Sequence, residues 1–182
     1  MSIRALPEMP WIAGSLALDL ANTIVLGAGP DGRDLDILTD PELAGTWAAR
    51  AGGGRLVRLS TEERIVLRGL VREAFNAAAV GAPLMGDIVD RLNQLAASAP
   101  HVLSIDPHGE LAWTTVAPSL PGEIAAETIR LATPPVAELL HRCPARSCGI
   151  FYEAARPDQR WCSPTCGSRG RAARRAKQAK AA

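Results

Sequence analysis

The four cysteines of this chain are gathered in a short stretch near its C-terminal end. They are Cys143, Cys148, Cys162 and Cys166, and the 142 residues before them contain no cysteine. Their spacing is C-x4-C, a connector of 13 residues, then C-x3-C. Each close pair can place two thiolates on one side of a turn, and the connector can fold the pairs together, as tetrahedral coordination requires. The pattern predicts one zinc ion per chain, held by all four cysteines.

Disulfide bonding is the alternative use of these thiols, and four cysteines allow three pairings. Disulfides persist mainly in exported proteins. The apolar stretch from Trp11 to Ala28 is interrupted by Asp19 and Asn22, and no basic region precedes a small-residue cleavage site. We therefore expect neither a signal peptide nor a membrane span. A reducing, cytoplasmic location is expected, which favours zinc over disulfides.

The net charge of +1 conceals two segments of opposite sign. Residues 1–140 carry 10 basic and 17 acidic side chains, a net charge of −7, whereas residues 141–182 carry 10 basic and 2 acidic ones, a net charge of +8. Four thiolates and one Zn²⁺ would leave the second segment at +6. We expect two domains: an acidic body over 1–140 and a basic zinc module over 141–182.

The residues after Cys166 are typical of a basic helix, with alanines on one side and cations over a broad opposite arc. A cationic helix beside a zinc site suits the phosphates or the major groove of DNA. The expected DNA contacts are Arg169, Arg171, Arg174, Arg175, Lys177 and Lys180. Arg169 lies on the alanine side close to the zinc ligands, which also fits a structural role. RNA binding, docking on an acidic body as a protein-interaction module, and a solvated tail remain alternatives.

The body is predicted to be mainly helical. Apolar periodicity and capping signals predict helices over 14–24, 41–50, 61–80, 87–97 and, in one or two pieces, 121–142. Ser60 and Glu63 form a capping box before the longest helix. The inner face of that helix is expected to carry Ile65, Leu67, Leu70, Val71, Ala74 and Phe75. Alternating residues predict one small antiparallel hairpin over 101–106 and 110–116.

Two sets of polar residues in the body are candidates for ligand binding. Arg64, Arg68 and Arg72 recur at i+4 steps, but neighbouring glutamates favour a solvated face. Asp19 and Asn22 are spaced to point together into a pocket for a small-molecule effector, although satisfying loop amides is the commoner role of such a pair. No H-E-x-x-H or G-x-S-x-G string occurs. We expect no enzymatic activity.

The cysteine module is predicted to follow the order of elements found in treble-clef zinc fingers. Residues 143–148 suit a knuckle whose backbone amides also approach sulfur. Residues 151–153 and 159–161 suit two short strands around a turn at 156–158, and Ser163-Pro164 suits the start of a helix. The expected fold class is therefore mainly α with a small antiparallel β-hairpin in the N-terminal body, followed by a treble-clef-like zinc finger.

The module resembles the CGNR zinc-finger family, whose pattern joins C-x4-C and an aromatic-rich hairpin to R-W-C-S-x-x-C-G-N-R and a basic helix. The matching residues are Phe151, Arg160, Trp161, Cys162, Ser163, Cys166, Gly167 and Arg169. Ser168 stands where that family has Asn, and Glu153 stands where Asp is usual. The contacts of these two residues are therefore not implied by the resemblance.

The N-terminal region is similar to the partner of that finger, the ABATE domain. The similarity lies in Gly14-Ser-Leu-Ala-Leu-Asp-Leu-Ala-Asn-Thr23 and Asp36-Ile-Leu-Thr-Asp-Pro-Glu-Leu-Ala-Gly-Thr-Trp47. The resemblance implies a stress-responsive transcriptional regulator of the bacterial cytoplasm. It also implies a body that senses a small molecule or forms a homodimer, and a finger that binds DNA.

Overall fold

The computed structural model of the chain describes residues 9, 11–12, 14–146 and 148–179, and most of these residues are helical. The α-helices of this part are α1 (Leu16–Ala21), α2 (Pro41–Arg50), α3 (Thr61–Ala79), α4 (Gly86–Ala96), α5 (Leu120–Ala132) and α6 (Pro164–Ala179). Short 3-10 helices occupy Pro30–Gly32, Ile37–Thr39, Ala51–Arg58 and Val136–Leu139. None of the described helices is both long enough and apolar enough to cross a membrane.

Strands in the described residues pair only in twos, and every pair is antiparallel. The strands are β1 (Ile24–Val25), β2 (Leu35–Asp36), β3 (His101–Ile105), β4 (Leu111–Thr115), β5 (Leu140–Arg142) and β6 (Phe151–Glu153). They form the sheets β1–β2, β3–β4 and β5–β6. The fold is therefore mainly helical with small antiparallel sheets, as the sequence predicted. The β3–β4 hairpin is the one expected, and the other two pairs were not predicted.

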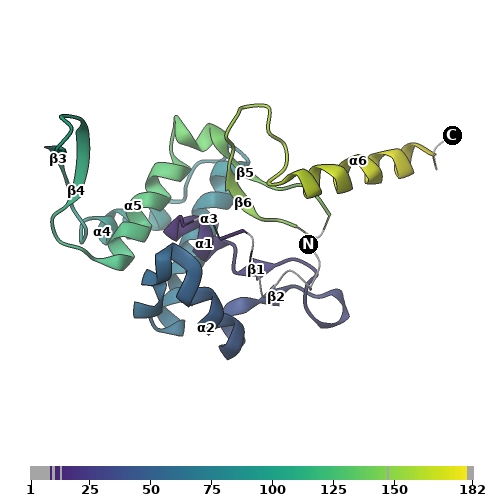
Figure 1. Ribbon diagram of the computed structural model, residues 1–182, viewed down its shortest axis with the longest axis horizontal. Helices are drawn as coiled ribbons and strands as arrows, with labels where there is room; N and C mark the ends of the chain where they lie inside the picture. The colour runs from purple at the N-terminus through teal and green to yellow at the C-terminus, as the bar shows by residue number, and fades with distance from the viewer. Residues whose placement is uncertain (1–8, 10, 13, 147, 180–182) are drawn as a thin grey trace.

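Helix α1 lies at the centre of the body, and all of its residues are buried. It packs against α3 and α5, and Figure 1 shows these helices together in the middle of the molecule. The sequence prediction of a helix over 14–24 was too long, because Ser15 caps the N-terminus and Asn22 ends the helix. Helix α2 begins and ends as predicted, with the Asp40 carboxylate accepting hydrogen bonds from the amides of its first turn.

Helix α3 shows the predicted capping box between Ser60 and Glu63. The prediction of its faces was wrong in part, because Ile65 is 36% exposed whereas Arg64 and Arg68 are only 8% and 6% exposed. The arginine stripe is therefore not a solvated face. Each of its members is held by acceptors in the body.

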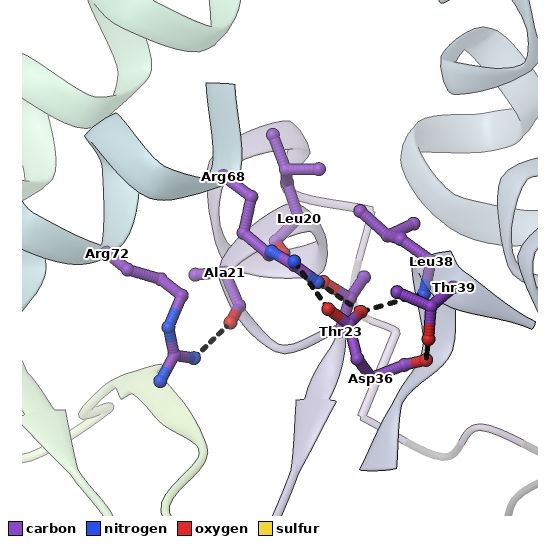
Figure 2. A network of polar contacts seen from close by, with 8 residues as sticks. All are labelled: Leu20, Ala21, Thr23, Asp36, Leu38, Thr39, Arg68 and Arg72. Atoms are coloured by element: carbon purple, nitrogen blue, oxygen red, sulfur yellow. Dashed lines mark hydrogen bonds and ion pairs between the residues drawn. The ribbon is translucent and has the colours of Figure 1, made fainter. Parts of the chain in front are cut away.

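The acceptors of Arg68 and Arg72 come from segments distant in the sequence (Figure 2), whereas that of Arg64 lies eight residues before it. Arg68 forms an ion pair with Asp36, with Nη2 to Oδ2 at 2.7 Å, and also donates to Thr23 Oγ1. Arg72 donates to the carbonyl oxygen of Ala21 at 2.6 Å. Arg64 donates through Nε to the carbonyl oxygen of Leu56. A long side chain can span the gap between α3 and the loops, so these arginines fasten the loops that surround α1.

The β3–β4 hairpin and helix α6 lie at opposite ends of the molecule (Figure 1). The hairpin follows α4 and precedes α5. Helix α6 projects past the remainder of the described chain. The cysteine cluster lies at the N-terminal end of α6, because Cys166 is in the first turn of that helix.

Candidate metal centre

The structure brings the four cysteines together. Their sulfur atoms all lie within 4.8 Å of one another, and the thiols of Cys143, Cys148 and Cys166 are buried. Cys148 Sγ is 3.6 Å from Cys162 Sγ and 3.7 Å from Cys166 Sγ, and the Cys162 and Cys166 sulfurs are 3.6 Å apart. All four are free thiols rather than disulfides.

These separations fit a single tetrahedral metal site. Metal–sulfur bonds of about 2.3 Å, the length typical of zinc, place the sulfurs of a tetrahedron about 3.8 Å apart. A disulfide would need sulfur atoms about 2.05 Å apart. The donor set consists only of sulfur, which suits a soft or borderline divalent metal rather than Ca²⁺ or Mg²⁺.

Backbone amides point at the first pair of sulfurs, as predicted for a knuckle. The amide of Ala145 donates to the sulfur of Cys143, and the amide of Ile150 donates to that of Cys148. The turn is closed by a hydrogen bond from the Cys148 amide to the carbonyl of Ala145 at 3.0 Å. Such N–H···S contacts stabilise thiolate charge, so this segment is shaped for deprotonated sulfur.

The thiols lie close enough to form hydrogen bonds with one another, and these bonds shift their pKa values in opposite directions. Hydrogen bonds from the thiols of Cys148 and Cys162 lower the pKa of Cys143 to about 2. The hydrogen bond to Cys143 raises the pKa of Cys148 to about 11, and the same partner raises the pKa of Cys162. Four thiolates at this distance repel one another strongly. A bound dication would remove that repulsion, which is the chemistry of a structural metal site.

The second pair of cysteines is placed by the start of helix α6. Ser163 Oγ accepts the Cys166 amide at 3.2 Å, and the Ser163 carbonyl accepts the Gly167 amide. Burial opposes ionisation of Cys166, but hydrogen bonds from Ser163 and Arg169 lower its pKa overall. The positive end of the helix dipole acts in the same direction.

Arg169 contacts the cysteine cluster directly. Its Nη2 lies 3.0 Å from the sulfur of Cys166, and that hydrogen bond raises the pKa of the guanidinium. A cation beside a thiolate offsets the negative charge that a dication with four thiolates retains. The sequence placed Arg169 close to the ligands, and the structure agrees. A contact between Arg169 and DNA stays a prediction.

Trp161 packs against the first turns of α6. A Cβ atom on Gly170 would lie 2.7 Å from Trp161 Nε1, so the ring approaches the helix at a position where only glycine fits. The guanidinium of Arg171 lies over the same ring at 5.9 Å and donates to Ser168 Oγ at 3.1 Å. Ser168, at the position where the resembled finger family has Asn, therefore helps to orient Arg171.

The connector between the cysteine pairs differs from the prediction. Residues 159–161 form no strand, and β6 pairs instead with β5, with Phe151 opposite Arg142 and Tyr152 opposite His141. The turn at 156–158 is present, closed by the Gln159 amide on the carbonyl of Arg156. Gln159 holds the returning chain through side-chain bonds to Ala155 and Trp161, which replace the ladder of a second strand.

Strand β6 joins the cysteine cluster to the body. Phe151 is 1% exposed and belongs to the body core, where its ring lies 5.6 Å from that of Phe75. The next residue, Tyr152, belongs to the apolar cluster around the cysteines. Burial raises the pKa of Tyr152 to about 12, and its hydroxyl donates to the carbonyl of Gln159.

Asn22 fastens β6 to the end of α1. Its Nδ2 donates to the carbonyl oxygen of Phe151 at 2.9 Å, and its Oδ1 accepts the Phe151 amide at 2.8 Å. The side chain thus pairs with the strand as a neighbouring backbone would. Sequence reasoning missed Phe151 as the partner, because nothing local relates residues 129 positions apart.

Asp19, the other predicted pocket residue, is fully buried and accepts hydrogen bonds from the amides of Gly14 and Gly52. Both members of the pair are therefore engaged with backbone groups. A role for them in binding a small-molecule effector stays a prediction. Glu153, the other departure from the resembled family, lies in an exposed pair with Arg130 at 3.4 Å.

The expected DNA-contacting residues whose side chains the structure describes divide into two sets. Arg171, Arg174 and Arg175 are exposed on α6, whereas Arg169 is turned to the metal centre. The backbone of Lys177 lies in α6, but its side chain is outside what the structure describes, and Lys180 lies outside the described residues altogether. Among the described ion pairs, none joins α6 to the acidic body.

An open cleft with a volume of about 450 Å³ lies beside the cysteine cluster. The sequence did not predict this cleft. It is lined in part by His141, Arg142 and Arg160. Arg142 also lies over the ring of Phe151 at 5.6 Å. These basic side chains extend the positive surface of the module beyond α6.

Comparison with known proteins identifies the body of the chain. Residues 14–140 match the model of the ABATE family, described as "Putative stress-induced transcription regulator", which covers more than half of the chain. A search of curated protein sequences found no match to this chain.

Proposed function

This chain belongs to the ABATE family of regulators, and from that membership we propose that it is a zinc-dependent DNA-binding transcriptional regulator. The single observation that carries the proposal is the exposed arginine surface of α6, which begins in the four-cysteine cluster. The family description is that of a regulator rather than an enzyme.

Zinc is the proposed metal because four thiolates in a tetrahedral arrangement are its usual structural site. When bound, it would supply the charge and the cross-link that let a small module hold its shape. The knuckle, the returning chain and a helix that carries the last ligands support a treble-clef-like finger over 141–182, attached to a body over 1–140. Cys143, Cys148, Cys162 and Cys166 are the ligands.

DNA is the proposed partner because α6 is cationic and projects beyond the acidic body (Figure 1). Arg171, Arg174 and Arg175 are exposed on it, and each phosphate that they neutralise releases counterions. The net charge of −7 on residues 1–140 repels DNA and so directs contact to the finger. Lys177 and Lys180 follow in the sequence and extend the same basic segment.

The test measures affinity of the zinc-loaded full chain for duplex DNA as a function of salt. The double variant Arg174→Ala/Arg175→Ala should lower the magnitude of the slope of log K against log salt by about 1.8, because two phosphate contacts are lost. Affinity at low salt should fall at least about tenfold. Chelation of the metal should also weaken binding, since α6 begins in the cysteine cluster.

The matched control is Arg58→Ala/Arg91→Ala, which removes the same charge from exposed positions on the body. It should leave the salt slope unchanged. If both double variants behave like the unaltered chain, α6 does not contact DNA. If duplex fails to bind at low salt, the basic helix is a docking element for an acidic protein, and preferential competition by RNA would assign RNA as the ligand.

A further inference from the structure

The β3–β4 hairpin exposes an unusual amount of apolar surface. Of the large hydrophobic residues that are exposed in the described part of the chain, six lie between positions 102 and 116. They are Val102 (47%), Leu103 (61%), Ile105 (79%), Leu111 (71%), Trp113 (66%) and Val116 (61%). Single exposed hydrophobic residues are ordinary, but a contiguous group on one element marks an interaction surface.

The register gathers the largest of these residues on one face. Leu103 lies opposite Trp113, and Ile105 lies opposite Leu111, so these four side chains project from the same side of the hairpin. The other side carries Ser104 and Thr114, whose hydroxyl oxygens are 2.8 Å apart, together with Ala112 and Val102, which is less exposed than any of the four residues of the apolar face. The hairpin therefore has the alternation of a sheet that is covered on one face.

Charged side chains do not oppose the packing of this face against a second copy of itself. Neither His101–Ile105 nor Leu111–Thr115 contains Asp, Glu, Lys or Arg, the residues that usually protect exposed strands from pairing. The acidic residues Asp106 and Glu110 lie at the tip. In a two-fold arrangement with antiparallel hairpins the two tips point to opposite ends, so their like charges stay apart.

We propose that this face, formed by Leu103, Ile105, Leu111 and Trp113, is the interface through which two copies of the chain form a homodimer. If these four side chains each offer roughly 150–250 Å², as aromatic side chains do, their exposed fractions amount to at most about 500 Å² per copy. Two such faces packed together bury up to about 1,000 Å², which is the lower limit for a specific interface. An apolar face of identical composition on each copy satisfies the self-complementarity of a two-fold contact.

The test compares the mass of the full chain by sedimentation equilibrium over about 1–100 μM, without DNA, so that its outcome is independent of the proposed DNA binding. The unaltered chain should show a monomer–dimer equilibrium. Leu103→Lys should raise the dimer dissociation constant at least tenfold, because it buries a charge in the interface. Val102→Lys is the matched control, since it places the same charge on the opposite face of the same strand and should leave the equilibrium unchanged.

A second measurement keeps the proposal testable if Leu103→Lys does not fold. Amide hydrogen exchange across 101–116 in the unaltered chain should slow as concentration rises through the dimer range, while exchange in α6 should not change. A chain that remains monomeric at 100 μM would overturn the proposal. So would a dimer that Leu103→Lys and Val102→Lys affect equally.

Discussion

Buried polar side chains, rather than large apolar ones, make several of the long-range connections in this molecule. Arg68 ties α3 to the segment around Asp36, and Asn22 ties α1 to β6. Each such side chain is almost fully withdrawn from water, so loss of its partner leaves unsatisfied groups behind. The arginines of α3 illustrate the limit of sequence reasoning at this scale, because i+4 spacing among glutamates describes a solvated face equally well.

Replacement of Asn22 by Ala should destabilise the folded chain by about 2–4 kcal/mol, because the buried amide and carbonyl of Phe151 both lose their partner. Urea unfolding measures the change. Asn76→Ala is the control: Asn76 is exposed and makes only a 3.5 Å contact with Arg142, so its loss should cost less than about 0.5 kcal/mol. Equal effects of the two substitutions would contradict the assignment of Asn22.

At the scale of elements, helix α6 contains glycines, which disfavour a helix, and packs against the ring of Trp161. Gly167 and Gly170 weaken the helix intrinsically, since glycine costs about 1 kcal/mol relative to alanine in a helix interior. Gly170 lies against the Trp161 ring, which could not approach the helix as closely over a larger residue, whereas a Cβ atom on Gly167 would lie 3.5 Å from the same ring, an ordinary contact distance. Packing against Trp161 therefore accounts for glycine at position 170.

Gly170→Ala should destabilise the module despite the better helix propensity of alanine, because the new Cβ would lie 2.7 Å from Trp161 Nε1. Gly69→Ala in α3 is the matched substitution, with no atom within 4 Å of the added Cβ, and it should stabilise the chain by up to about 1 kcal/mol. Thermal unfolding of the metal-loaded protein measures both changes. Stabilisation by both substitutions would show that Trp161 does not constrain α6.

Elements with local signals were the ones that the sequence predicted well. The Asp40 cap with Pro41, the Ser60–Glu63 box and the alternation around residues 107–109 each define an element from a few neighbouring residues. The four cysteines were likewise found from spacing alone. A local pattern is enough where turn and cap chemistry determines the backbone.

The elements that were missed depend on partners far away in the sequence. The β1–β2 and β5–β6 pairs are two or three residues long, too short for an alternating pattern. The expected strand over 159–161 is replaced by hydrogen bonds through Gln159, and β6 instead finds its partner at β5. No local rule indicates which of two possible neighbours a three-residue strand selects.

At the scale of the whole molecule, two separate groups of buried residues meet at β6. One is the body core around α1, which includes Phe151, and the other surrounds the cysteines and includes Tyr152. The body core contains its own large anchors, such as Trp47 and Phe75. None of the largest fully buried side chains among the described residues belongs to the group around the cysteines, so we expect its stability to depend mainly on a bound metal.

Purified protein should contain about one equivalent of zinc under reducing conditions, and less than half an equivalent would contradict the assigned site. Chelation should then increase hydrogen exchange at amides between 143 and 170 while α1 and α3 stay protected, because the body core does not include the thiols. Mass spectrometry of peptic fragments measures both regions in one sample. Loss of protection throughout the chain would show that the two groups of residues unfold as one.

Strand β6 also sets a limit on how the length of this chain can vary. Phe151 faces the body core and Tyr152 faces the cysteines, because successive side chains of a strand point to opposite sides. Insertion or deletion of one residue between Cys148 and Phe151 would exchange the two rings between their surroundings. Length changes can be accommodated instead at 155–158, where the residues are exposed and no alternation has to be preserved.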